Sequence, residues 1–204
     1  MNRPRAKGTM AESAVVAYLR GNGWLMAERR ALHGSLDQGD VTGTPGLVWE
    51  VKYANGGVRM AAWVAQTEVE RLNGHADYGI LVIKPAALGA TQTNRWFAVM
   101  MAESFERLQQ QAIQETKGFS PHVVMLGPHP YSAPVMFTKL FAARLGPDMG
   151  AVRMYPPGGK DHHNGHYVAI YLEDMVKLLH AAGYGTPPPK ALQVRPHQQD
   201  FRGT

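Results

Sequence analysis

The chain has 204 residues, of which 45% are hydrophobic and 18% are charged, a composition typical of a folded protein and not of a disordered one. It contains no cysteine, which excludes disulfides, thiolate zinc sites and a cysteine nucleophile. The 21 Lys and Arg residues outnumber the 16 Asp and Glu residues and give a formal charge of +5. This charge favours a polyanionic partner, because basic groups that contact phosphates release condensed counterions.

The sequence predicts neither a membrane segment nor a nucleotide site. No apolar run reaches the length of about 18 residues that a membrane span needs, and no apolar stretch follows the basic N-terminus as it does in a secretory signal. Walker A and dinucleotide-binding glycine patterns are also absent from the sequence. We therefore expect a cytoplasmic protein with one main domain, no membrane partner and no nucleotide cofactor.

The first predicted element is a helix. Thr9 and Glu12 have the spacing of a capping box, in which a hydroxyl and a carboxylate bind backbone N–H groups at a helix start. An apolar stripe with helical period follows, and the helix is expected to end at about Arg20, before two glycines. A basic arm precedes this helix and consists of Arg3, Arg5 and Lys7.

Two strands joined by a turn are predicted next. Residues 24–31 have strand character and lead through a polar, glycine-containing connection to Asp40. A Thr-Pro-Gly turn signal follows, and the segment 47–52, Leu-Val-Trp-Glu-Val-Lys, has the β-branched and aromatic residues of a central strand. This arrangement would place Asp40 and Glu50 on one hairpin.

A second helix is predicted over 60–73, followed by strands at 78–84 and 95–101 and a helix at 103–114. The expected buried stripe of the helix at 60–73 consists of Ala61, Val64, Ala65, Val69 and Leu72. The expected buried stripe of the helix at 103–114 consists of Phe105, Leu108 and Ala112. The resulting order is αβββαβ, followed by βα.

Weaker patterns predict an extended segment, a helix, a strand and a helix at 122–126, 133–145, 167–172 and 173–182. The strand–helix unit that begins near residue 96 resembles the one that begins at residue 167, either by coincidence or as a pseudo-repeat. Proline-rich residues from 186 onward predict an extended or flexible tail.

Three charged side chains meet if the hairpin forms. Side chains alternate along a strand, so Glu50 and Lys52 project to one side, while Trp49 and Val51 project to the other and can pack under the first helix. Asp40, on the neighbouring strand, would lie beside the charged pair. Two adjacent carboxylates repel each other, and a Mg²⁺ ion bound between them removes that repulsion.

Such a site has the chemistry of phosphodiester hydrolysis. A divalent cation polarises the phosphate and lowers the pKa of a bound water, and Lys52 would orient that water or neutralise developing negative charge. The alternative is a solvated Glu-x-Lys pair on an exposed strand, which is a common arrangement. The Gly39-Asp40 pair, the turn after it and the preceding helix with Glu12 favour the catalytic interpretation.

These residues resemble the PD-(D/E)XK nuclease superfamily, and most closely its archaeal and phage Holliday-junction resolvases, over about residues 7–84. The family's helix glutamate is matched by Glu12, its hairpin aspartate by Asp40, and its Glu-x-Lys by Glu50 and Lys52. The resemblance implies a restriction-endonuclease-like αβββαβ α/β fold, in which helices flank a mixed central sheet. It further implies that these four residues are catalytic and that Asp40, Glu50 and Glu12 bind Mg²⁺, for which Mn²⁺ can substitute.

The resemblance also implies a homodimer that binds DNA and nicks four-way junctions symmetrically, in recombination or repair. The residues expected to contact DNA are Arg5, Lys7, Arg29, Arg30 and Gln66. Family members carry a basic residue on the first strand, matched by Arg29 or Arg30, and a glutamine on the second helix, matched by Gln66. In the alternative interpretation Glu12 only caps its helix, Gln66 is a plain exposed helix residue, and the two arginines form a solvated strand edge.

The resemblance covers only part of the chain. We predict a nuclease core at 1–115, a C-terminal α/β extension without an assigned role at 116–183, and a flexible tail at 184–204. Because the extension could alter substrate choice, a PD-(D/E)XK nuclease for a flap, an end or a specific duplex stays open. A noncatalytic DNA-binding module of the same fold also stays open. The small size and the lack of cysteine suit a bacterial or phage protein acting at the nucleoid.

Three histidines, His162, His163 and His166, lie close together in the sequence. Imidazoles at this spacing could bind Zn²⁺ or Ni²⁺. An HNH-type site is excluded, because that family spreads its ligands over a hairpin and a helix. A glycine-containing loop without a metal is the favoured interpretation, and Lys160 could contact phosphate.

Overall fold

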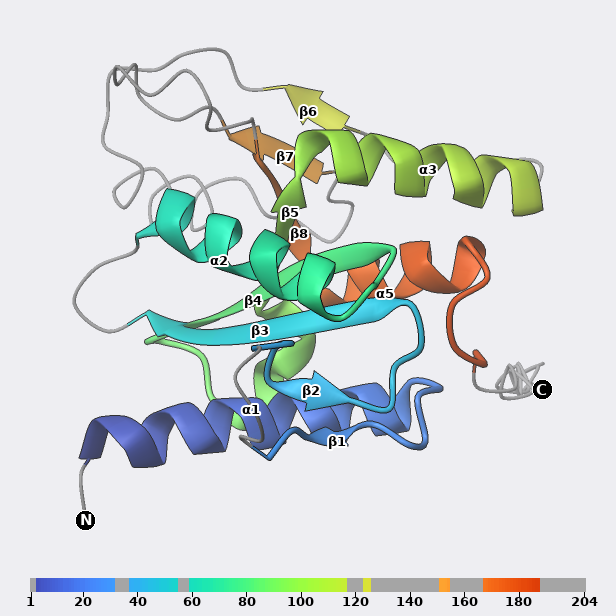
Figure 1. The fold of residues 1–204 in the computed structure, drawn as a ribbon. Helices are drawn as coiled ribbons and strands as arrows, with labels where there is room; N and C mark the ends of the chain where they lie inside the picture. The colour runs from blue at the N-terminus through green and yellow to red at the C-terminus, as the bar shows by residue number, and fades with distance from the viewer. Residues whose placement is uncertain are drawn as a thin grey trace, which may run out of the picture.

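The computed structural model describes residues 3–31, 37–54, 59–116, 123–125, 151–154 and 167–187. The predicted helix at 133–145 and the histidine cluster lie outside these residues. The protein is an α/β protein in which helices flank a mixed sheet (Figure 1). None of the described helices is both long and apolar enough to cross a membrane.

The first six elements follow the predicted order αβββαβ. They are α1 (Arg3–Gly21), β1 (Glu28–Arg29), β2 (Val41–Thr42), β3 (Leu47–Ala54), α2 (Met60–Asn73) and β4 (Tyr78–Pro85). The later elements are a 3₁₀ helix η1 (Ala90–Arg95), β5 (Phe97–Met101), α3 (Ala102–Thr116), β6 (Val123–Met125), β7 (Ala151–Met154), β8 (Tyr167–Tyr171) and α5 (Leu172–Ala181). The predicted strand at 95–101 therefore begins two residues late, because Arg95 still belongs to η1.

Within the described ranges the strands form one eight-stranded sheet in the order β1-β2-β3-β4-β5-β8-β7-β6. The strands β1, β2 and β3 pair antiparallel, and α2 then crosses the sheet so that β4 runs parallel to β3. Antiparallel pairs join β4 to β5, β5 to β8 and β8 to β7, and β6 is parallel to β7. The sheet is thus mixed, and β3 and β4 form its parallel centre.

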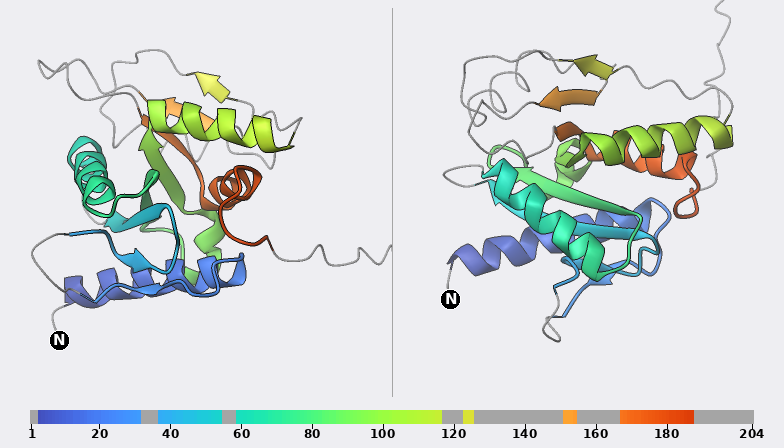
Figure 2. Two further views of the ribbon diagram at one scale, coloured as in Figure 1. Left: turned by 45° about the vertical axis from the view of Figure 1, so that its right-hand side comes forward. Right: turned by 45° about the horizontal axis from the view of Figure 1, so that its top comes forward.

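Side-chain alternation along β3 and β4 divides the core into two clusters. Trp49 and Val51 pack with residues of α1, α3 and α5 on one face of the sheet, as predicted for the packing under the first helix. On the other face Met60 and Val64 of α2 pack on alternate residues of β4 and β5. Figure 2 shows α2 on one side of the sheet and α5 on the opposite side.

The first helix begins earlier than the capping box predicts. Helix α1 starts at Arg3, so Thr9 lies within the helix, where its carbonyl accepts a hydrogen bond from Ser13. Pro4 is compatible with this early start, because a proline in the first helical turn lacks only an N–H that has no intrahelical partner. Glu12 is therefore mid-helix, and the capping interpretation of its carboxylate is wrong.

The predicted strand at 24–31 shrinks to the two residues of β1. Gly23, with φ +98°, turns the chain after α1, and a hydrogen bond from Ala27 N to Trp24 O closes a second turn. These turns place the Trp24 indole in the core and leave Leu25 and Met26 each 77% exposed. Residues 22–27 therefore form turns and do not pair in the sheet.

Helix α2 has the predicted bounds, but only part of its predicted stripe is buried: Val64 and Ala61 face the core cluster under α2. Its buried residues are Met60, Val64, Thr67 and Glu70, whereas the predicted core residues Val69 and Leu72 are 57% and 60% exposed. The helix lies close to β4 at Gly79, where an added Cβ would meet Thr67 Cγ2 and Thr67 O at 3.1 Å. This close approach leaves no room for a bulky side chain opposite Gly79, and Val69 and Leu72 point away from the sheet.

The C-terminal elements belong to the same sheet and core. In β5 and β8, Phe97 pairs with Tyr171 and Val99 with Ala169, and the helix that follows each strand packs in the cluster that contains α1. The two similar sequence segments are thus adjacent antiparallel strand–helix units. The inward residues predicted for α3 are buried, which confirms its orientation.

Candidate active site

Asp40 lies just before β2, and backbone hydrogen bonds to two neighbouring segments hold it in place. Its N–H donates to Trp49 O, and its carbonyl accepts from Arg30 N, each at 2.8 Å. Gly39 precedes it with φ +83° and lies so close to β3 that a Cβ would be 2.8 Å from Trp49 O. Only glycine combines this backbone conformation with this approach. The Asp40 carboxylate then reaches along β3, where its Oδ2 accepts a 2.8 Å hydrogen bond from Val51 N.

Glu50 and Lys52 lie on the sheet face that α2 covers, as the alternation predicts. They are in register with Leu81 and Ile83 of β4, which belong to the core cluster under α2. Lys52 Nζ forms an ion pair with Glu50 Oε1. Glu50 is 3% exposed, whereas the Lys52 side chain is 26% exposed. The carboxylate is therefore buried, and the ammonium can still reach solvent.

Gln66 extends from α2 into this group, as the family resemblance implies. Its Nε2 donates to Glu50 Oε1 at 3.2 Å and to Glu70 Oε1 at 2.7 Å. Glu70 is a member of the group that the sequence analysis missed. It is 1% exposed, and its second oxygen, Oε2, is buried without a hydrogen-bond partner among the described residues. The spacing of Gln66 and Glu70, four residues apart on one helical face, was the available signal.

Burial makes these carboxyl groups hard to ionise. Desolvation raises the pKa of Asp40 to about 8, and the nearby charge of Glu50 adds to the effect. Desolvation also raises the pKa of Glu50 to about 7, although Lys52 opposes the shift. The pKa of Glu70 rises to about 7 for the same reason, opposed by the bond from Gln66. Perturbed carboxyl groups gathered around one lysine are typical of functional sites.

The neighbouring carboxylates stabilise the charged form of Lys52. Burial alone would lower the pKa of Lys52, but its bond to Glu50 and the charges of Glu50, Asp40 and Glu70 raise it. Lys52 therefore carries a proton and acts as a cation in this site. It can donate hydrogen bonds or neutralise negative charge, and it does not serve as a base while its carboxylate partners remain ionised.

The donor set suits a Mg²⁺ ion that keeps most of its water. Among the residues that the structure describes, no group of three or more His, Asp or Glu side chains is arranged to hold a metal ion. Mg²⁺ usually binds through one or two carboxylates and retains several waters, which Asp40 and Glu50 can provide. The buried Oε2 of Glu70 has no hydrogen-bond partner among the described residues, so it is an acceptor available to water bound to such a cation.

Glu12 approaches this site from α1 but is already paired. Its Oε2 accepts hydrogen bonds from Arg29 Nε at 2.8 Å and from Arg29 Nη2 at 2.6 Å. The charge of Glu12 contributes to the raised pKa of Asp40, so the two carboxylates are neighbours. Asp40, Glu50 and Glu12 do not form a three-ligand group among the described residues. A direct metal contact by Glu12 stays a prediction that requires its second oxygen or release from Arg29.

The residues expected to contact DNA are spread around the site. Gln66 lies within it, and Arg29 holds Glu12. Arg30 Nη1 donates to Gln38 Oε1 at 3.0 Å, and its buried Nε has no partner among the described residues. Lys7 Nζ lies 5.5 Å from the centre of the Tyr53 ring. The side chain of Arg5 is outside the described set.

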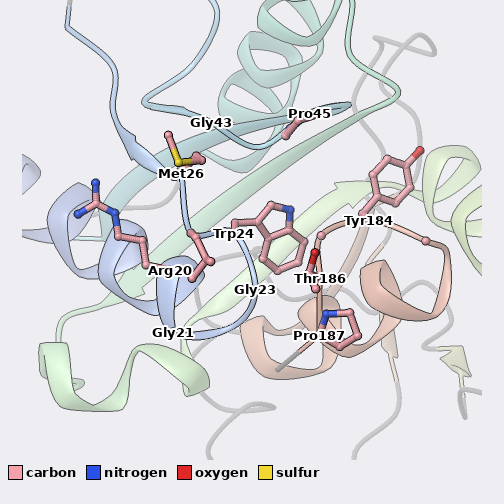
Figure 3. Close-up of a pocket in the computed structure, with 13 residues that line it drawn as sticks. Arg20, Gly21, Gly23, Trp24, Met26, Gly43, Pro45, Tyr184, Thr186 and Pro187 are labelled. Atoms are coloured by element: carbon pink, nitrogen blue, oxygen red, sulfur yellow. The ribbon is translucent and has the colours of Figure 1, made fainter. Parts of the chain in front are cut away.

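A separate apolar groove of about 670 Å³ lies between the α1–β1 corner and residues 183–187. Figure 3 shows Trp24, Met26 and Pro45 at the groove together with Tyr184 and Thr186 of the C-terminal segment. Among the described residues no carboxylate lines the groove, so the groove is separate from the acidic site. His180 holds the C-terminal segment there, because its Nδ1 lies 2.8 Å from Tyr184 O and its ring stacks on Trp24 with 4.6 Å between the ring centroids.

Comparison with known proteins finds no protein-family model, no curated protein and no solved structure that matches the chain. A function for the protein must therefore be argued from the chemistry of Asp40, Glu50 and Lys52.

Proposed function

We propose that the protein is a metal-dependent endonuclease of the PD-(D/E)XK type that hydrolyses phosphodiester bonds in branched DNA, as a Holliday-junction resolvase does. One observation carries the proposal. Asp40 Oδ2 is bonded to Val51 N, the residue between Glu50 and Lys52, so two carboxylates and one ammonium from adjacent strands meet at one place. The observed order αβββαβ, with β3 parallel to β4, supports the restriction-endonuclease-like fold.

Each residue has a role that follows from its contacts. Asp40 and Glu50 would hold the cation, and Gln66 fixes the orientation of the Glu50 carboxylate through its amide. When bound, Mg²⁺ would supply charge neutralisation at the scissile phosphate and lower the pKa of a bound water. Lys52, cationic and partly exposed, would orient the attacking water and neutralise charge that develops on the phosphate oxygens.

The DNA partner and the dimer are part of the same proposal. The net charge of +5 supports binding to a phosphate backbone, and Lys7 on α1 is a candidate contact. Paired symmetric nicks in a four-way junction require two active sites, which a homodimer would supply. Cutting of a flap, an end or a specific duplex is the second candidate within the same chemistry.

The proposal is tested by offering the purified protein a labelled four-way junction, a flap, a linear duplex and a single strand, each with Mg²⁺, with Mn²⁺ and with chelator. Symmetric nicks in the junction that need a divalent cation are the expected result. Cation-dependent cutting of another substrate alone would replace the junction by that substrate. Tight binding without cleavage of any substrate would overturn the nuclease assignment and leave a DNA-binding module.

A matched pair of variants assigns any cleavage to this site. Asp40→Asn removes one carboxylate from the site, and Glu68→Gln removes one carboxylate from the surface ion pair between Glu68 and Arg71. Cleavage should be lost in the first variant and retained in the second. Equal activity of both variants would indicate a contaminating nuclease or a different active site.

A further inference from the structure

Glu70 is a carboxylate buried between α2 and the sheet. It is 1% exposed, and one of its oxygens has no partner among the described residues. A carboxylate buried in this way costs free energy unless it is paired or protonated. The same helix leaves Val69 and Leu72 exposed, so α2 is oriented with an acid toward the sheet and two large apolar side chains toward solvent. The close packing at Gly79 accounts for the orientation of α2, but it does not account for a buried carboxylate on that face.

Glu70 is connected to the proposed cation ligands through one side chain. The Nε2 group of Gln66 donates to Glu50 Oε1 and to Glu70 Oε1, so it bridges the two carboxylates. The negative charge of Glu70 acts on Glu50 and on Lys52. Glu70 therefore influences the site both through the orientation of Gln66 and through its charge.

The charge balance of the site gives a reason for a third acid. Glu12 and Arg29 neutralise each other. With Asp40, Glu50 and Glu70 ionised, three carboxylates stand against the single ammonium of Lys52. The net formal charge of the site is then −2, which one divalent cation neutralises. Without Glu70, the net formal charge would be −1.

We propose that Glu70 is a positioning residue of the cation site: it increases the affinity of Asp40 and Glu50 for a divalent cation by adding negative charge and by holding the Gln66 amide on Glu50. This inference rests on the proposed function, because it takes Asp40 and Glu50 as the ligands. It predicts a trade-off in which the residue destabilises the cation-free protein and strengthens cation binding. A purely structural glutamate would stabilise the protein and leave cation binding unchanged.

The test uses Glu70→Gln, which keeps the shape of the side chain and an oxygen that accepts from Gln66 but removes the charge. Mn²⁺ affinity, measured by calorimetry and by water-proton relaxation without DNA, should fall about tenfold, the lower end of the usual effect of partners around a metal ligand. The melting temperature without cation should stay equal or rise. Glu68→Gln, on the same helix but paired with Arg71, should change Mn²⁺ affinity by less than about twofold.

A second variant examines the route through Gln66. Gln66→Ala removes the bridge and should weaken Mn²⁺ binding, and the double variant with Glu70→Gln should lose less than the product of the two single effects, because both act on Glu50. Unchanged Mn²⁺ affinity in Glu70→Gln, or a lower melting temperature without cation, would overturn the inference.

The outcomes separate this inference from the proposed function. If the wild-type protein binds Mn²⁺, Asp40→Asn abolishes binding and Glu70→Gln has no effect, only the role of Glu70 fails. If the wild-type protein binds no Mn²⁺, or if Asp40→Asn does not weaken binding, both the inference and the metal-dependent nuclease assignment fail.

Discussion

Val51 N donates a 2.8 Å hydrogen bond to Asp40 Oδ2, so a backbone group of β3 holds the side chain of the residue that precedes β2. This bond fixes the aspartate next to Glu50 without the help of a cation. Pre-organisation of this kind reduces the ordering that a ligand must otherwise cause, and it makes the effect of single substitutions at the site predictable.

Asp40→Asn should abolish cation-dependent cleavage and leave the fold intact. The asparagine amide oxygen can still accept from Val51 N, whereas a neutral amide is a poor ligand for Mg²⁺. Loss of negative charge should leave DNA affinity unchanged or slightly increased. Cleavage rate, DNA affinity and melting temperature are the measurements, and a parallel loss of DNA binding would count against a role restricted to the cation.

Lys52→Met should separate stability from cation binding. The substitution keeps an unbranched side chain but leaves Glu50 buried without its ammonium partner, at a cost of about 1–3 kcal/mol in the cation-free protein. Mn²⁺ affinity should be retained or increased, because a neighbouring positive charge has been removed. Cleavage should fall at least about 100-fold, since Lys52 no longer orients water or stabilises charge. Unimpaired cleavage would exclude a catalytic role for Lys52.

The sequence alone predicted the strand β3, the bounds of α2 and the position of Asp40 next to Glu50 and Lys52. These features follow from local patterns: a β-branched strand, a helical period and strict side-chain alternation. The buried face of α2 was predicted only in part: Val64 is buried as predicted, whereas Val69 and Leu72 are exposed. The orientation of α2 reflects the close contact with Gly79 and the bond from Gln66 to Glu50 of β3, and neither is visible in hydrophobic periodicity.

Glu12 shows a different limit of sequence reasoning. Its spacing from Thr9 matches a capping box, yet α1 continues toward the N-terminus past Thr9. The carboxylate instead pairs with Arg29, which is 17 residues away in the sequence. A pairing across elements of this kind depends on the position of β1 beside α1, and the short β1 itself was predicted to be much longer. Tertiary contacts thus decided the role of a residue whose local motif was complete.

Cation affinity should rise with pH. The carboxyl groups of Asp40 and Glu50 have pKa values of about 8 and about 7 without a cation, and a divalent cation must displace their protons to bind. Mn²⁺ affinity should therefore fall at least about tenfold from about pH 8 to about pH 6, with proton release on binding at the lower pH. Calorimetry in buffers of different ionisation enthalpy measures the released protons, and a pH-independent affinity would contradict the proposed ligands.

Stability of the cation-free protein should change in the opposite direction. An acid whose pKa is raised on folding contributes stability that is complete below its unfolded pKa and is lost as the pH rises through its folded pKa. For Asp40, the loss should extend from its unfolded value of 3.8 to about 8. Added Mg²⁺ should restore melting temperature most at the alkaline end. Thermal melts of the wild type and of Asp40→Asn across this range, with and without Mg²⁺, test the attribution, because the variant should show a flatter pH profile.

Gly39→Ala should displace Asp40 and weaken both the fold and the site. The residue has φ +83°, and an added Cβ would lie 2.8 Å from Trp49 O and from Val48 Cγ1, so the loop before β2 must move away from β3. The left-handed conformation alone costs about 1–2 kcal/mol for a residue with a side chain.

Gly21→Ala is the matched control, because nothing lies within 4 Å of its added Cβ and alanine favours the end of α1 by up to about 1 kcal/mol. Chemical denaturation and Mn²⁺ titration should show lower stability and weaker cation binding in Gly39→Ala and neither effect in Gly21→Ala. If Gly39→Ala bound Mn²⁺ as tightly as the wild type, the close packing of this glycine on β3 would not be what positions the Asp40 carboxylate.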